Sequence, residues 1–300
     1  MARNTTESPH THGVSHHPLQ QGTTVIAWTE GRFIDPHSPL VGASDPGLMT
    51  GQGMFDTIAA YHGRLWALEA HLSRLSASLT AAHIPQPQVD LDEGARLVAA
   101  HLRNVPVGRI RITVLNTHEG SRTVITATPE PHAPALGAPH PTDARVAITP
   151  WARSPLMPFA GHKSTSYAHN IQALHWAYAQ GADEGLWHGP NGGLCEGSVS
   201  NLLTVVDGQL ATASAQCGVL PGVTLAVVRE VCHELGGVRE LSAVEVGEVV
   251  GVGQGGALVG TLRMIQPIGV VDGVPGEVPG VIRRAQELVA AAMPDFLADA

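Results

Sequence analysis

A proline- and alanine-rich segment divides this chain into two parts. Residues 129–141 (PEPHAPALGAPHP) show neither the alternation of a strand nor the periodicity of a helix. On both sides of this segment, short strands and helices follow one another irregularly, which favours α+β domains over a doubly wound parallel sheet. The sequence therefore predicts a small N-terminal α+β domain over residues 23–130, a linker over 131–143 and a larger C-terminal domain over 144–300.

Residues 1–22 form a polar tail that contains His10, His12, His16 and His17. A histidine-rich tract can bind metal, but a disordered tail is the simpler interpretation, and we predict no metal site. The net charge of −9 disfavours a nucleic-acid partner. No apolar run is long enough to cross a bilayer and no secretory signal is recognisable, so we expect a cytoplasmic protein without a membrane partner. The three cysteines form no close pair, so a disulfide framework is not expected.

Local patterns predict several hairpins and strands. The pairs Glu30-Gly31, His62-Gly63 and Asp207-Gly208 each separate two apolar runs. Asp-Gly is the firmest of these turn signals, because a type I′ turn needs positive φ at both central positions. Residues 109–115 and 122–128 are expected to be strands.

Helical periodicity occurs at three places. A third helix is expected to begin near Gly222 and to end at Gly236-Gly237. The first two have apolar stripes at helical spacing, formed by Leu65, Leu68, Leu72, Leu75 and Leu79, and by Tyr167, Ile171, Leu174 and Tyr178.

Lys163 is the single lysine among the 17 Lys and Arg residues of the chain. A codon bias toward arginine explains why lysine is rare but not why this one is present. Lysine can lose its proton and act as an amine nucleophile, whereas arginine effectively cannot. Small residues surround Lys163 in Gly-His-Lys-Ser-Thr-Ser-Tyr and leave room for a bound ring. Lys163 is therefore a candidate nucleophile.

An enzyme that forms a Schiff base with pyridoxal phosphate needs an amine, a cradle for the phosphate and a carboxylate facing the pyridine nitrogen. Glu196 is the candidate carboxylate, because it lies between glycines and small hydroxyl residues, although an exposed turn would look the same. Its neighbour Cys195 is interpreted as a buried thiol, since no histidine is placed to activate it.

The sequence offers two candidates for the phosphate cradle and one cation. Residues 219–224 open a helix, where free N–H groups face an anion and Thr224 adds a hydroxyl. Thr261 follows a glycine-rich stretch that resembles a dinucleotide fingerprint, but a strand rather than a helix is expected after it, so that interpretation fails. Arg74 could bind the phosphate, or could be an ordinary surface arginine.

Together these residues resemble the class IV (fold type IV) pyridoxal-phosphate enzymes, which include branched-chain and D-amino-acid aminotransferases and aminodeoxychorismate lyase. Five segments carry the resemblance in the family's order. They are residues 45–57 (DPGLMTGQGMFDT), residues 71–75 (HLSRL), Lys163 with Tyr167 nearby, residues 196–201 (EGSVSN) and residues 220–224 (LPGVT).

The resemblance implies the D-amino acid aminotransferase-like fold, with the cofactor bound mainly by the larger C-terminal domain, and a homodimer. It implies that Lys163 forms the Schiff base and shuttles protons, and that Glu196 pairs with the pyridine nitrogen. The remaining cofactor residues implied are Arg74, Thr224 and Thr261 for the phosphate, Leu220 and Val223 against the cofactor, and Tyr167 for the ring hydroxyl.

This chain departs from the family in the first segment and after the strand at 109–115. Gln52 and Asp56 replace the family's Asp and Glu, Pro46 replaces an arginine, and residues 116–120 (NTHEG) replace an Arg-Gly pair. We expect these positions to lie toward the substrate, so that cofactor binding is intact and substrate identity is open.

Three functions are compatible with these residues. The leading hypothesis is aminodeoxychorismate lyase, which yields 4-aminobenzoate and pyruvate, because the lysine segment and residues 109–114 (RIRITV) look like the lyase-like branch. Arg109 or Arg111 would bind a substrate carboxylate, since alternation places both on one face of a strand. The alternative is an aminotransferase acting on branched-chain or D-amino acids, and the third is a non-catalytic protein that keeps the fold.

Overall fold

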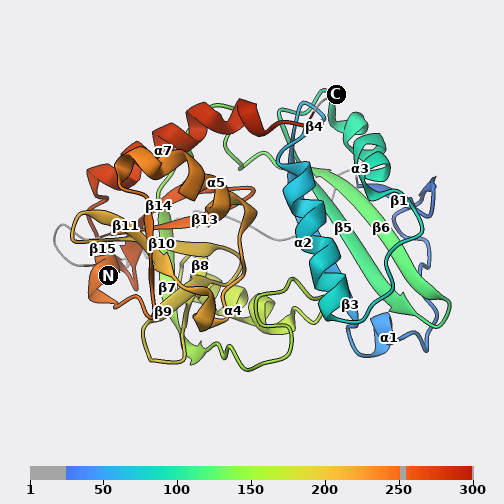
Figure 1. Ribbon diagram of the computed structural model, residues 1–300, viewed down its shortest axis with the longest axis horizontal. Helices are drawn as coiled ribbons and strands as arrows, with labels where there is room; N and C mark the ends of the chain where they lie inside the picture. The colour runs from blue at the N-terminus through green and yellow to red at the C-terminus, as the bar shows by residue number, and fades with distance from the viewer. Residues whose placement is uncertain (1–24, 251–254, 299–300) are drawn as a thin grey trace, which may run out of the picture.

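The computed structural model describes residues 25–250 and 255–298, and each half of the chain contains one large sheet (Figure 1). The histidine-rich tail and residues 251–254 of the glycine-rich stretch lie outside the described residues. No helix within the described ranges is both long and apolar enough to span a bilayer.

The N-terminal half is an antiparallel sheet covered by helices on one face. Its strands, in spatial order, are β2 (Arg32–Ile34), β1 (Ile26–Thr29), β6 (Gly120–Pro129), β5 (Val107–Thr117), β3 (Gly53–Tyr61) and β4 (Arg64–Leu65). The helices are α1 (Pro46–Met49), α2 (Leu68–Ala81) and α3 (Leu91–Ala99), followed by the 3-10 turn η1 (Ala100–Leu102). Ile110 and Ile112 of β5 pack with Leu75 and Leu79 of α2 in one hydrophobic core. Alternate residues of β5 therefore face away from the helices.

The C-terminal half contains a larger mixed sheet that curls back on itself, because its last strand also pairs with a strand inside the sheet. The spatial order is β12 (Val238–Leu241), β11 (Gln209–Ala213), β10 (Asn201–Val206), β13 (Gly256–Gly260), β14 (Met264–Val271), β7 (Ala144–Ala152), β8 (Glu184–His188) and β9 (Leu194–Gly197), with β15 (Val274–Pro275) paired to β14. Strand β9 also pairs with β10, so that Glu196 lies opposite Asn201. The helical elements are α4 (Ala168–Ala179), η2 (Ala215–Cys217), α5 (Val223–Val231), η3 (Cys232–Leu235), α6 (Gly247–Val250), α7 (Gly280–Ala292) and η4 (Met293–Phe296).

The three predicted hairpin turns are confirmed. Glu30-Gly31, His62-Gly63 and Asp207-Gly208 connect paired antiparallel strands, and all six residues have positive φ. The two long strands expected after residue 108 are confirmed within β5 and β6, and residues 130–143 contain no helix or strand.

The predicted helices are confirmed, with a correction at one end of two of them. Leu65 belongs to strand β4, and α2 begins only at Leu68, because Ala67 between them adopts positive φ (50°). The stripe after Lys163 lies on α4. The third helix is α5, with Gly222 as its N-cap, but it ends at Val231, and only the 3-10 turn η3 continues to Gly236.

The segment around Lys163 crosses from the C-terminal half to the N-terminal sheet. Phe55 N–H donates to Lys163 O (2.8 Å), and Thr165 N–H donates to Gly53 O (2.8 Å). A Cβ at residue 53 would lie 2.8 Å from Thr165 Oγ1, so the close approach requires glycine there. Backbone groups of Gly53 and Phe55 thus hold the segment around Lys163 against β3.

Candidate active site

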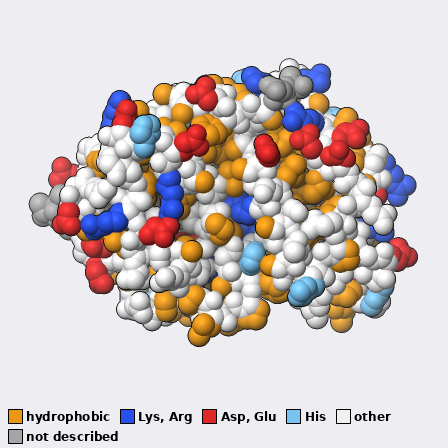
Figure 2. Space-filling model, viewed as in Figure 1, with side chains coloured by type: hydrophobic (Ala, Val, Ile, Leu, Met, Phe, Trp, Pro, Cys, Tyr) orange, Lys and Arg blue, Asp and Glu red, His pale blue; other side chains and the backbone are white. Residues whose placement is uncertain are grey.

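A cavity of about 650 Å³ lies between the two halves. Phe55, Arg74 and Arg111 line it from the N-terminal half, and Lys163 and Glu196 line it from the C-terminal half. On the face shown in Figure 2, hydrophobic side chains gather along the boundary between the halves, with a basic side chain at its centre. All ten residues that the sequence singled out as a site line this one cavity: Arg74, Arg109, Arg111, Lys163, Tyr167, Glu196, Leu220, Val223, Thr224 and Thr261.

Lys163 presents its amine to the cavity beside two aromatic rings that contact each other. Its Nζ lies 5.0 Å from the ring centroid of Phe55 and 5.6 Å from that of Tyr167. Burial lowers the pKa of Lys163 to about 8, because the charged ammonium loses its hydration there. A much larger fraction of this amine is therefore neutral and nucleophilic near neutral pH than of an ordinary lysine, although the protonated form still predominates below pH 8.

The low pKa can be checked directly, because no other lysine exists in the chain. We expect acylation of Lys163 by an amine-directed reagent to increase with pH and to reach half its plateau near pH 8, since only the neutral amine reacts. Mass spectrometry of the peptide containing Lys163, after brief labelling over a pH series, measures the profile. A midpoint near 10.5, the ordinary lysine value, would show that the amine is hydrated in solution.

Glu196 is a buried carboxylate at the far side of the cavity from the N-terminal sheet. Its Oε1 pairs with Arg153, and its Oε2 accepts a hydrogen bond from Leu220 N–H (3.0 Å). Burial raises the pKa of Glu196, while the neighbouring Arg153 opposes that shift. Arg153, just after β7, was not singled out from the sequence. The requirement that a buried carboxylate has a cationic partner was the only indication of such a residue.

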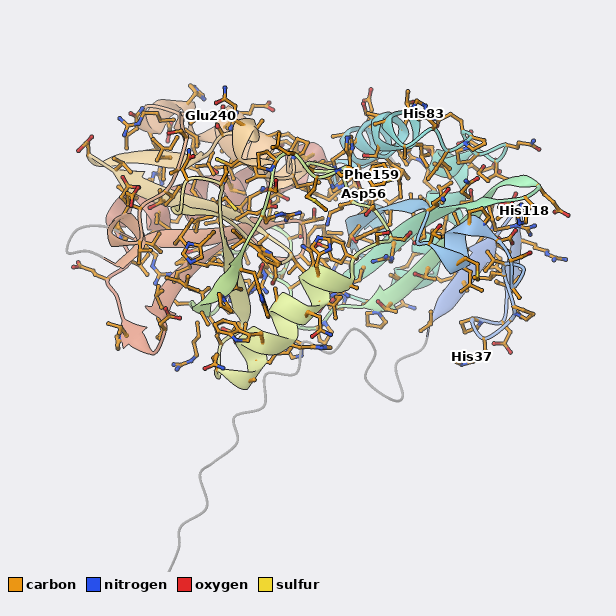
Figure 3. The ribbon with its side chains drawn as sticks, turned by 90° about the horizontal axis from the view of Figure 1, so that it is seen from below. His37, Asp56, His83, His118, Phe159 and Glu240 are labelled. Carbon is orange, nitrogen blue, oxygen red and sulfur yellow. The ribbon has the colours of Figure 1, made fainter. Side chains whose placement is uncertain are left out.

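Arg74 is held in place by Asp56. Its Nε and Nη2 donate to the two oxygens of Asp56 at 2.9 and 2.7 Å, and its Nη1 donates to Pro221 O (3.1 Å). Asp56 was expected to lie toward the substrate, which is wrong: it is buried beneath Arg74 and also pairs with His71 Nδ1 (2.9 Å). Figure 3 shows Asp56 at the boundary between the halves, with His83 and His118 far from it.

The charges of this group follow from its burial. Burial alone would raise the pKa of Asp56, but the hydrogen bond with His71 and the charge and hydrogen bonds of Arg74 outweigh it, so the pKa is lowered. The pKa of His71 is lowered by burial, so the ring is neutral at pH 7. Asp56 and Arg74 therefore form a buried ion pair that leaves further N–H donors of the guanidinium directed at the cavity.

Two hydroxyl groups lie close together at the N-terminus of helix α5. Thr224 Oγ1 is 3.4 Å from Thr261 Oγ1, and Thr224 lies in the first turn of α5, where backbone N–H groups are unpaired. The N-cap residue Gly222 lies directly against the side chain of Asn201. Only glycine fits there, because a Cβ would lie 2.0 Å from Asn201 Oδ1. Together with Arg74, this corner of the cavity presents hydroxyl, backbone and guanidinium donors, which suits an anion.

Tyr167 lies at the N-cap of α4, with its ring edge toward Phe55 at a centroid distance of 5.1 Å. Its hydroxyl donates to Ser198 O (3.4 Å), and burial raises its pKa. The apolar stripe of α4 that begins at Tyr167 includes Ile171, Leu174 and Tyr178, and all of them line the cavity.

Arg109 and Arg111 both extend from β5 toward the cavity. Arg109 is paired with Glu130, whereas Arg111 stacks on the Phe55 ring, with its Cζ 3.6 Å from the centroid, and donates to Thr113 Oγ1 (3.2 Å). Burial lowers the pKa of Arg111 to about 10, and the group is still cationic at neutral pH. Within the described residues, no carboxylate forms an ion pair with Arg111.

The other departures from the family do not line this cavity. Gln52 Oε1 accepts a hydrogen bond from Asn116 Nδ2 (3.0 Å) at the end of β5, and Pro46 begins α1 nearby. Cys195 is confirmed as a buried thiol: its Sγ contacts Trp187 O (3.5 Å) and burial raises its pKa to about 12. The glycine-rich stretch is followed by strand β13 and not by a helix, which confirms the rejection of the dinucleotide interpretation.

A buried lysine and a buried carboxylate thus line one cavity between two sheets. The family model described as amino-transferase class IV matches residues 53–269, and the chain belongs to this family.

Several curated proteins and solved structures are similar to the chain. A bifunctional aminodeoxychorismate lyase / D-amino acid transaminase of Mycobacterium tuberculosis is 27% identical over 271 residues, covering 83% of this chain and 92% of that protein. A putative branched-chain-amino-acid aminotransferase of Methanocaldococcus jannaschii is 27% identical over 219 residues, covering 70% and 75%. A PLP-bound hypothetical aminotransferase from Mycobacterium tuberculosis superimposes with a TM-score of 0.77 at 24% identity, covering 91% and 99%.

Proposed function

We propose that the cavity binds pyridoxal phosphate and that the enzyme cleaves 4-amino-4-deoxychorismate to 4-aminobenzoate and pyruvate. Lys163 would bind the cofactor's aldehyde carbon, and Glu196 would face its pyridine nitrogen. Arg74, Thr224 and Thr261 would hold the phosphate. The remaining cofactor contacts would come from Leu220 and Val223 against the ring and from Tyr167 at the ring hydroxyl.

The residues of the cavity fit this cofactor. The amine, the carboxylate and the anion-binding corner all line one cavity, and they match the aldehyde, the ring nitrogen and the phosphate of the cofactor. Glu196 is held by Arg153 and Leu220 N–H, and both interactions favour the ionised carboxylate that a protonated ring nitrogen needs. The corner formed by Arg74 and Thr224 supplies donors, and the carboxylate beside it, Asp56, is paired with Arg74.

The bound cofactor supplies an electron sink for the carbon that carries the substrate amine. The chain supplies proton transfer and orientation. Lys163 Nζ, neutral near pH 8, removes the proton from that carbon and then donates a proton to the departing enolpyruvyl group, so that the products are 4-aminobenzoate and pyruvate. The Phe55 and Tyr167 rings lie beside Nζ and give this part of the cavity an apolar surface.

The observation that carries the proposal is the meeting of Lys163, Glu196 and Arg74 around one cavity, beside Arg111, which has no ion-pair partner among the described residues. The lyase is supported by the resemblance of the lysine segment and of residues 109–114 to the lyase-like branch. The similarity to the bifunctional aminodeoxychorismate lyase / D-amino acid transaminase of Mycobacterium tuberculosis supports both candidate reactions. The test is to give the purified holoenzyme aminodeoxychorismate without a keto acid and to follow 4-aminobenzoate. Sustained multiple turnover supports the lyase.

The second candidate is an aminotransferase acting on branched-chain or D-amino acids. It is supported by the similarity to the branched-chain enzyme of Methanocaldococcus jannaschii and by the transaminase half of the bifunctional relative. In this reaction Lys163 would pass the proton to the cofactor's former aldehyde carbon, and no group would leave the substrate. Conversion of the bound cofactor to its amine form by an amino acid, with no release of 4-aminobenzoate, would favour this candidate.

Replacing Arg111 with glutamine is expected to weaken binding of a carboxylate substrate by about 10- to 100-fold, the range for a charged hydrogen bond. The cofactor's visible absorbance should be unchanged, because Arg111 contacts Phe55 and Thr113 rather than the anion-binding corner. Steady-state KM and spectroscopic titration with the substrate measure the effect. Arg122→Gln on the neighbouring strand is the matched control, and equal KM values for the two variants would contradict the assignment of Arg111.

We further propose a homodimer, as the family resemblance implies. Leu48, Met49, Leu156 and Met157 are large apolar side chains that are 58–91% exposed, which is compatible with contact to a second copy. Light scattering on the purified protein tests this assignment. The cytoplasmic location is still a prediction of the sequence.

A further inference from the structure

Two side chains at the start of α4 donate to the same carbonyl oxygen. Tyr167 is the N-cap of α4, and Asn170 follows three residues later, so both side chains can lie on one face of the helix. The Tyr167 hydroxyl donates to Ser198 O (3.4 Å), and Asn170 Nδ2 donates to the same atom (2.5 Å). All three residues line the cavity. The carbonyl of Ser198 therefore has two donors where one would satisfy it.

The two hydrogen bonds differ in strength. Hydroxyl hydrogen bonds ordinarily span about 2.5–3.0 Å, so the bond from Tyr167 at 3.4 Å is long and weak. The bond from Asn170 is short, and Asn170 is only 2% exposed. The amide atom facing Ser198 O must be the nitrogen, because a carbonyl oxygen can only accept. Tyr167 can therefore leave Ser198 O at little cost as long as Asn170 stays in place.

The carbonyl of Ser198 cannot be left without a donor at little cost. Ser198 is fully buried and lies two residues after Glu196. Its N–H donates to Gly185 O (2.8 Å) on β8, which fixes the residue in place. A buried carbonyl that loses its donor destabilises the state in which this happens. Without Asn170, Tyr167 would be the remaining side-chain donor to this oxygen among the described residues.

The amide of Asn170 contributes through this one bond. Its Oδ1 is buried and has no hydrogen-bond partner in the described part of the chain. An unpaired buried oxygen costs free energy, so the side chain is not held by a closed network of its own. The bond from Nδ2 to Ser198 O is the polar interaction that Asn170 makes, and it ties α4 to the segment that carries Glu196.

We propose that Asn170 is a positioning residue, which keeps Ser198 O satisfied and so frees the Tyr167 hydroxyl to donate to the ring hydroxyl of the cofactor. This inference rests on the proposed function, which places Tyr167 at that ring hydroxyl. In the cofactor-free protein both side chains donate to Ser198 O. When the cofactor binds, the Tyr167 hydroxyl exchanges its acceptor and Asn170 alone holds the carbonyl. Asn170 thus acts on the cofactor through Tyr167.

The test is a double-mutant cycle on cofactor affinity. Pyridoxal phosphate is titrated into the cofactor-free full-length protein and its visible absorbance is followed. We expect Asn170→Leu to weaken binding about tenfold, because either Ser198 O loses its donor or Tyr167 stays with it. In the Tyr167→Phe background the same change should alter affinity less than about twofold, since phenylalanine has no hydroxyl to exchange.

Gln286→Leu is the matched control for this cycle. Gln286 is 5% exposed on α7, and its Nε2 donates to Ile265 O (3.0 Å), so this change also removes a buried amide donor from a backbone carbonyl. Its effect on cofactor affinity should be the same with tyrosine or phenylalanine at residue 167, because no exchange of acceptors is involved.

Two results would overturn the inference. Equal weakening by Asn170→Leu in both backgrounds would show that Asn170 supports only the packing of α4. Unchanged affinity of Tyr167→Phe would show that Tyr167 makes no bond to exchange. Circular dichroism checks each fold, and Asn170→Ser, which also lacks the amide donor, carries the same expectation if the leucine variant does not fold. Absence of visible absorbance in the unaltered protein would instead refute the proposed function.

Discussion

Replacing Lys163 with arginine is expected to abolish the visible absorbance of the bound cofactor and to lower turnover by about a thousandfold or more. Arginine keeps the positive charge and most of the length of lysine, but it cannot lose its proton and so cannot react with an aldehyde or shuttle a proton. The fold should be intact, because the contacts of this segment with β3 are made by backbone groups of Phe55 and Lys163 and by Thr165. Absorbance spectra, turnover and far-UV circular dichroism measure the three effects.

The single lysine makes this experiment unusually specific. In the unaltered enzyme, reduction of the holoenzyme with borohydride should attach the cofactor to the peptide that contains Lys163, since no other side-chain amine exists in the chain. The matched control is Arg153→Lys, which introduces a lysine into the same cavity beside Glu196. Retention of absorbance and activity by Lys163→Arg, or attachment of the cofactor elsewhere, would refute the central assignment.

Local patterns predicted the elements of this fold well, because their causes are local. Asp207-Gly208 forms the expected turn because both residues tolerate positive φ, and that preference is readable from two residues. Asp272-Gly273, which joins β14 to β15 with positive φ at both residues, carries the same pattern but was not singled out. Leu65 was assigned to a helix because its spacing fits, and only the positive φ of Ala67 separates it from α2.

Partners that are distant in sequence could not be predicted in this way. Asp56 and Arg74 are 18 residues apart, and Arg153 and Glu196 are 43 residues apart, so neither pair leaves a local pattern. Strand alternation correctly placed Arg109 and Arg111 on one face. It could not show that, among the described residues, only Arg109 is paired with a carboxylate, because Glu130 follows the end of β6 and lies 21 residues from Arg109 in sequence.

Replacing Asp56 with asparagine is expected to lower the free energy of unfolding of the cofactor-free protein by about 3 kcal/mol, the lower end of the cost of breaking a buried ion pair. Asparagine preserves the shape of the side chain and can still accept one hydrogen bond, so the change isolates the lost charge. Arg74, whose side chain is only 12% exposed, is then left without its counter-charge. Chemical denaturation of the apo protein measures the difference.

The same variant should respond more strongly to anions than the unaltered protein does. Inorganic phosphate can supply Arg74 with the negative charge that Asp56 no longer provides, so the phosphate-dependent rise in Tm should be larger in Asp56→Asn. Asp92→Asn is the matched control, because it breaks an Asp–Arg pair on α3 whose side chains are 38–46% exposed and should cost less than about 1 kcal/mol. If Asp56→Asn costs no more than this control, or if phosphate raises the Tm of both proteins equally, Asp56 is not the counter-charge that positions Arg74.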